Sequence, residues 1–133
     1  MNSCEETKKE LQSLIETAKA LHNALLEDEE GNCKNYTYFT DNYEVWYSKS
    51  MVLIKQLLPE RFEDFKHQYT DKRRKDIDVS TYAISDALRG VTAYNGYFGP
   101  STATSCILNQ LNMLKSCLET FDSKIYNLSL IHI

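Results

Sequence analysis

Residues 107–128, ILNQLNMLKSCLETFDSKIYNL, carry the most regular apolar pattern in the chain. Apolar side chains recur there at alternating spacings of four and three residues: Ile107, Leu111, Leu114, Leu118, Phe121, Ile125 and Leu128. On an α-helix this spacing forms one continuous stripe, which a second helix can cover in a coiled-coil-like seam. We therefore expect a long C-terminal helix that packs against a partner helix.

The N-terminal segment offers the matching stripe. Its apolar residues, spaced by three and four, are Leu11, Leu14, Ala18, Leu21 and Leu25. Ser3 and Glu6 form a capping-box pattern that predicts the helix start, and Gly31, after the acidic residues 27–30, predicts its end. Two such stripes in a short domain indicate the core of a bundle. The alternative is a homodimer that pairs through an exposed stripe.

The segment after Gly31 is rich in aromatic residues. Asp41 and Glu44 form a second capping-box pattern, and the apolar positions from Tyr43 to Leu58 follow a helical period. We expect the second helix to begin there and most of its aromatic side chains to pack in the core. The aromatic residues that precede it are expected to be the more exposed ones: Tyr36, Tyr38 and Phe39.

Two further helices are expected before the C-terminal one. Pro59 suits the first turn of a third helix, which should reach Tyr69 and turn Phe62 and Phe65 inward. A fourth helix should begin near residues 78–80 and stop at Gly90. The charged residues 70–78 read as a loop, and we expect 91–101 to be the longest irregular connection.

Length and composition agree with this helical reading. A chain of 133 residues fits one domain, and its hydrophobic fraction of 42% can supply a core. Only four Gly and two Pro leave little room for tight hairpins. The sequence therefore predicts an all-α fold, a single bundle of about five helices with the long N- and C-terminal helices packed together.

The overall charge and hydropathy pattern narrow the class of protein. A formal net charge of −4 argues against a surface built as a whole to neutralise phosphates. The N-terminus has no apolar core of the length that a signal peptide needs, and the longest apolar run, 51–54, is far too short to span a bilayer. We expect a cytoplasmic protein without a membrane contact.

Residues that could carry chemistry are scattered. The four cysteines contain no C-x-x-C pair, and none of the three histidines has a second histidine or cysteine three or four positions away, of the sort that a helical metal site needs. The glycines near residue 96 lack the ending of a phosphate-binding loop. We therefore expect no catalytic residue, no cofactor and no metal site in this chain.

One charged run is a candidate contact site: Lys72, Arg73, Arg74 and Lys75. Four adjacent cations can bind phosphates or an acidic partner. Asp71, Asp76 and Asp78 flank the run and cancel much of its field. A solvated loop is thus the plainer reading, and a contact with nucleic acid or a protein partner is the alternative.

Several motifs follow one another in the middle of the chain. They are Tyr43-Glu-Val-Trp46-Tyr47, Leu57-Leu-Pro-Glu-Arg61-Phe-Glu-Asp-Phe65, Tyr69, the basic run up to Ile77-Asp78, and Thr81-Tyr82-Ala-Ile84-Ser-Asp86. In this order, over about residues 40 to 126, the chain resembles the N-terminal helical region of an uncharacterised prokaryotic protein family. The C-terminal domain of that family resembles a HEPN domain, an all-α fold often found in defence and toxin ribonucleases.

The resemblance implies an accessory region and not a nuclease centre. HEPN ribonucleases typically carry an Arg-x4-His motif, whereas five residues separate Arg61 from His67 here. Any nuclease activity would then belong to a downstream domain. The end of the chain, residues 128–133, resembles the start of a translated sequencing adapter. We accordingly expect a bundle domain over 1–127 and a non-native tail over 128–133.

Together these observations predict a non-enzymatic helical interaction or regulatory module of a larger prokaryotic protein, linked through the resemblance to defence or toxin systems. Its partner would be its own C-terminal domain or another protein. The alternative from a different class is an RNA-binding or RNA-processing accessory module that uses the basic loop 72–75.

Overall fold

The computed structural model describes residues 3–93, 96 and 98–131, and the side chains of 4–93, 96 and 98–122. Seven helical elements follow one another in this part: α1 (Ser3–Leu25), α2 (Tyr36–Leu57), the 3-10 turn η1 (Pro59–Arg61), α3 (Phe62–Tyr69), α4 (Ile84–Leu88), the 3-10 turn η2 (Pro100–Ala103) and α5 (Thr104–Ile131). Within these residues strand pairing is limited to two isolated bridges, Glu27 with Cys33 and Ala93 with Phe98. The predicted all-α bundle is confirmed.

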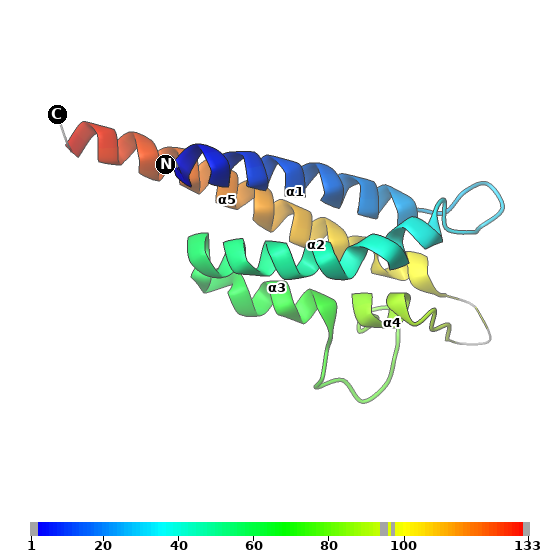
Figure 1. Ribbon diagram of the computed structural model, residues 1–133. Coiled ribbons are helices and arrows are strands. Elements are labelled where there is room, and N and C mark those ends of the chain that lie inside the picture. Colours follow the sequence, from blue (N-terminus) through cyan, green and yellow to red (C-terminus); the bar gives the residue numbers. More distant parts are fainter. Residues whose placement is uncertain (1–2, 94–95, 97, 132–133) are drawn as a thin grey trace.

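The long helices α1 and α5 run side by side over most of their length (Figure 1). The apolar stripe of α1 is buried from Leu11 to Leu25, and Ile107, Leu111 and Leu114 of α5 are buried with it. Leu118 and Phe121 are half-buried at the edge of the same core. The predicted pairing of the first and last helices is therefore confirmed, because each stripe excludes water from the other.

Helix α2 packs against both α1 and α5 and is joined to each by a buried polar contact. Trp46 Nε1 donates to the Leu14 carbonyl of α1 at 2.8 Å. The Tyr43 hydroxyl donates to Gln110 Oε1 of α5 at 2.7 Å, and Gln110 Nε2 donates to the Phe65 carbonyl of α3 at 3.0 Å. Gln110 is fully buried and thus ties three helices together.

The second helix begins earlier than the capping pattern at Asp41 predicts. Asn35 is the N-cap, and its side chain accepts from the Tyr38 amide. The prediction that Tyr36, Tyr38 and Phe39 precede the helix and are exposed is wrong: Phe39 is fully buried and the two tyrosines are half-buried. The start moves because Phe39 continues the buried stripe of Tyr43 and Trp46 by one turn.

The next two boundaries follow the proline and glycine signals. Pro59 opens the short 3-10 turn that leads into α3, where Phe65 is fully buried and Phe62 half-buried. Gly90, with φ of 68°, ends α4 as predicted. A left-handed backbone at that position favours glycine.

Helix α4 and helix α1 are shorter than predicted. The fourth helix begins at Ile84 and not near 78–80, because Asp78 and Thr81 form a hydrogen-bonded turn that competes with the helix. As a result 70–83, and not 91–101, is the longest irregular connection between the described helices. Helix α1 ends at Leu25 and not in the acidic run 27–30.

Part of the predicted pattern falls on residues whose side chains lie outside the described set. These are the N-cap role of Ser3 and the stripe positions Ile125 and Leu128. The division into a domain over 1–127 and a non-native tail over 128–133 also stays a prediction.

Candidate functional site

The connection 70–83 carries the basic run and is held in shape by its own polar side chains. Asp78 Oδ1 accepts from the amides of Ser80 and Thr81 at 2.9 and 3.0 Å, and the Thr81 hydroxyl donates to the Asp76 carbonyl at 2.8 Å. The hydrogen bond from the Ser80 hydroxyl, with those from the two amides, lowers the pKa of Asp78. Such turns fix a loop without secondary structure.

Arg74 anchors this connection to α4. Its guanidinium donates through Nη1 and Nη2 to the two carboxylate oxygens of Asp86, with 2.6 Å between Nη2 and Oδ1, and Nη1 also donates to the Thr81 carbonyl at 2.8 Å. Asp86 Oδ2 accepts from the Ala83 amide at 2.8 Å, which caps α4. Arg89 adds a third cationic contact, at 3.0 Å.

The carboxylate of Asp86 is fully buried, and the Arg74 side chain keeps only 15% of its surface exposed. Burial by itself would raise the pKa of Asp86, but the hydrogen bonds from Arg74 and Ala83 outweigh it and hold that pKa below its ordinary value. The carboxylate is therefore charged, and the ion pair is part of the fold.

The structure thus separates the four basic residues that form one run in the sequence. Arg74 points to Asp86, while Lys72, Arg73 and Lys75 are exposed. Lys72 and Arg73 border a hollow between α2, α3 and the loop, and Lys75 lies outside its lining. The candidate contact set is divided into one structural residue, two groove residues and one surface residue.

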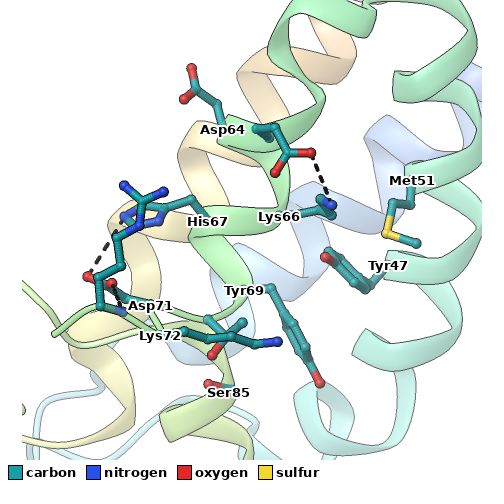
Figure 2. Close-up of a pocket in the computed structure, with 12 residues that line it drawn as sticks. Tyr47, Met51, Asp64, Lys66, His67, Tyr69, Asp71, Lys72 and Ser85 are labelled. Atoms are coloured by element: carbon teal, nitrogen blue, oxygen red, sulfur yellow. Dashed lines mark hydrogen bonds and ion pairs between the residues drawn. The ribbon is translucent and has the colours of Figure 1, made fainter.

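The hollow is an open groove with a volume of about 940 Å³. Figure 2 shows Tyr47 and Met51 of α2 on one side and His67 and Asp71 on the other, with Tyr69 and Lys72 between them. The remaining lining residues are Glu63, Asp64, Lys66, Thr70, Arg73 and Ser85. The groove is therefore built from α2, α3, α4 and the loop that Arg74 fixes.

Aromatic rings form one wall of the groove. The rings of Tyr47 and Tyr69 stack with their centres 4.5 Å apart, and Tyr47 also stacks on the buried Phe65 at 5.6 Å. Burial, with the nearby Tyr69 and Glu44, raises the pKa of Tyr47 to about 12. Both rings are half-buried and uncharged at neutral pH, so this wall is largely apolar.

The acidic residues of the groove already have partners. Glu63 pairs with Lys66 at 3.1 Å, and Asp64 pairs with Arg61 at 3.1 Å. Asp71 accepts from the Arg73 backbone amide at 3.1 Å and lies 3.8 Å from His67 Nε2. Among the described residues no carboxylate forms an ion pair with the side chains of Lys72 or Arg73, so both cations can pair with a ligand.

Two smaller hollows have a different character. One, between α3 and α5, is lined by Arg61, Asp64, Met113 and four polar, uncharged side chains. The other lies beside Cys33 and Tyr36, and burial together with Glu27 and Asp28 raises the pKa of the Cys33 thiol. A raised pKa reduces the thiolate fraction and makes this thiol a poor nucleophile.

Sequence reasoning missed the aromatic wall and the partner of Arg74. A signal for the partner of Arg74 was present, because Asp86 lies in the mostly apolar stretch Tyr82-Ala-Ile-Ser-Asp-Ala-Leu88. A carboxylate in a buried segment needs a cation or several donors. The wall gave no such signal, since Tyr47 and Tyr69 have the spacing of core residues.

Within the described residues, no group of three or more His, Cys, Asp and Glu side chains is arranged to hold a metal ion. In the same part of the chain, no helix combines the length and apolar character that crossing a membrane requires. Comparisons of the chain with protein-family models, with curated proteins and with solved structures find no match.

Proposed function

We propose that this chain is a non-catalytic interaction module that binds a protein partner in the groove between α2, α3 and the loop 70–73. One observation carries the proposal: Lys72 and Arg73 border a hollow with an apolar aromatic wall and have no acidic partner of their own. A concave site with an apolar wall and a few charged groups is typical of binding sites.

The way the polar groups are used supports binding over catalysis. Arg74, Asp86, Tyr43 and Gln110 are fully engaged in holding the fold. In the groove, His67 is largely exposed and 3.8 Å from its acidic neighbour, which is too loose for an oriented acid–base pair. On the resemblance described above, we place the module in a larger prokaryotic protein beside a HEPN-like domain, which would itself be one candidate partner.

A second candidate function is binding of single-stranded RNA. It is favoured by the position of Tyr69 and Tyr47 next to Lys72 and Arg73, because RNA-binding surfaces combine aromatic rings with cations. Glu63, Asp64 and Asp71 line the same groove and repel a phosphate backbone. We therefore rank this function second.

Site-specific photo-crosslinking in the source cells tests the proposal. A photoreactive amino acid replaces Met51, which lines the groove, and in a matched control it replaces Val79, which is exposed on the loop outside the groove. We expect a protein adduct from position 51 and none from position 79. An RNA adduct from position 51 would favour the second candidate, and equal or absent protein adducts at both positions would refute the proposal.

A further inference from the structure

The charge and shape of the groove indicate what kind of partner it takes. We propose that the groove binds a segment of a partner protein in which a carboxylate side chain lies next to a large apolar one. This inference rests on the proposed function, since it specifies the ligand of the same groove.

In the part of the chain that the structure describes, two cations border the groove without a carboxylate partner. Glu63 pairs with Lys66 and Asp64 with Arg61. Asp71 accepts from a backbone amide and lies 3.8 Å from His67 Nε2, and it has no Lys or Arg partner among the described residues. Lys72 and Arg73 then remain as the charges that a ligand can neutralise. A guanidinium and an ammonium on adjacent residues of one groove suit one or two carboxylates, and the guanidinium can bind a carboxylate in a bidentate manner.

The aromatic wall of the groove offers a surface for an apolar side chain of the ligand. Met51 and Tyr47 lie on the α2 side of the groove, and Tyr69 lies between them and Lys72 (Figure 2). A methionine beside stacked aromatic rings is an adaptable surface for an apolar side chain. A ligand that reaches Lys72 with a carboxylate can therefore place an adjacent apolar group on Tyr69, Tyr47 and Met51.

The charges of the groove fit a short acidic peptide better than a nucleic-acid strand. A nucleic-acid strand brings one negative charge per nucleotide and needs several cations along its path. Within the described residues, Lys72 and Arg73 have no ion-pair partner in the groove, whose lining also holds the carboxylates of Glu63, Asp64 and Asp71. A peptide that presents one acidic cluster avoids those carboxylates, whereas a continuous phosphate backbone does not.

Hydrogen bonds hold the loop that carries Lys72 and Arg73 in place. Arg74 ties the loop to the buried Asp86, and the Arg73 amide donates to Asp71, so the backbone under Lys72 and Arg73 is fixed before a ligand arrives. A site that is ordered in advance loses less entropy on binding. This favours a short linear segment as ligand, because the groove itself needs no rearrangement.

A peptide-display selection tests the inference. A random dodecapeptide phage library is selected on the purified wild-type chain and counter-selected on the double variant Lys72→Glu/Arg73→Glu. The control is Lys34→Glu/Lys75→Glu, which makes the same charge change at two exposed residues outside the groove lining. Circular dichroism checks that every variant is folded, and a decauridylate RNA is titrated in parallel by fluorescence anisotropy.

We expect recovered peptides in which Asp or Glu lies beside Leu, Met, Phe or Trp. The groove variant should bind them at least about fivefold more weakly than the wild type, and the control should bind them equally well. The inference is overturned if the selection recovers neutral or basic peptides or enriches no peptide. It is also overturned if both variants lose peptide affinity equally, or if the wild type binds the RNA more tightly than it binds the peptides. A groove-dependent protein adduct at position 51 without acidic peptides would leave the proposed function intact and overturn only this inference.

Discussion

Arg74 and Asp86, twelve positions apart in the chain, form a bidentate ion pair in which the carboxylate is fully buried. The pair joins the long loop 70–83 to the short helix α4, and the same carboxylate caps that helix at the Ala83 amide. Because an isolated buried charge is far less stable than a paired one, the two residues stabilise this corner of the fold only together.

The first prediction compares two neighbouring arginines. Arg74→Met should lower the free energy of unfolding by about 2–3 kcal/mol, because it leaves Asp86 buried with only the Arg89 contact and its backbone donor. Arg73→Met, the matched control at an exposed position, should change it by less than about 0.5 kcal/mol. Urea unfolding followed by the fluorescence of Trp46, the single tryptophan, measures both. Equal effects of the two substitutions would contradict the structural role of Arg74.

The second prediction concerns pH. The pKa of Asp86 is lower in the folded protein than in an unfolded chain, so its charged form contributes stability above the unfolded pKa of about 4. That contribution is lost as the pH falls through the lower, folded-state pKa. The stability difference between wild type and Asp86→Asn should therefore be largest near about pH 6 and shrink toward about pH 3. Urea unfolding at both pH values tests this, and a difference that is constant or grows on acidification would disprove it.

The third prediction concerns the buried glutamine that links α2, α3 and α5. Gln110→Leu leaves the Tyr43 hydroxyl without its acceptor and should cost about 1–3 kcal/mol. The double variant Tyr43→Phe/Gln110→Leu removes donor and acceptor together, so its cost should be smaller than the sum of the two single costs. Asn112→Leu, at an exposed position two residues further along α5, is the control. Strict additivity in the thermal or urea unfolding data would show that the two side chains do not interact.

The helices that could be predicted from the sequence are those with a long local period. The stripes Leu11–Leu25 and Ile107–Leu114 contain the spacing of a helix and favour a pairing within the bundle over a homodimer, and the structure has the pairing within the chain. The start of α2 is harder to predict from the sequence, because Asn35 and Asp41 are both residue types that favour the N-cap position. The earlier start adds the buried turn of Phe39, and it also makes distant contacts, such as the hydrogen bond from the Tyr36 hydroxyl to the Ala87 carbonyl at 2.6 Å. No local pattern reveals such a contact.

The candidate site shows the same division. The basic run could be found in the sequence, but adjacent cations look alike there, and only the path of the loop turns Arg74 inward and leaves Lys72 and Arg73 at the groove. The aromatic wall could not be found, because it forms where residue 47 of one helix meets residue 69 of another. A groove is a property of packing between segments, and sequence periodicity describes single segments.

The last prediction concerns Ser50, whose hydroxyl is buried on α2 and has no hydrogen-bond partner among the described residues. A buried and unpaired hydroxyl lowers stability, so Ser50→Ala should be neutral or should stabilise the fold by up to about 1 kcal/mol. Alanine also favours the helix by about 0.5 kcal/mol, and Ser48→Ala, at an exposed position of α2, measures that share alone. If Ser50→Ala is less stable than Ser48→Ala in urea unfolding, the Ser50 hydroxyl stabilises the fold and the prediction is wrong.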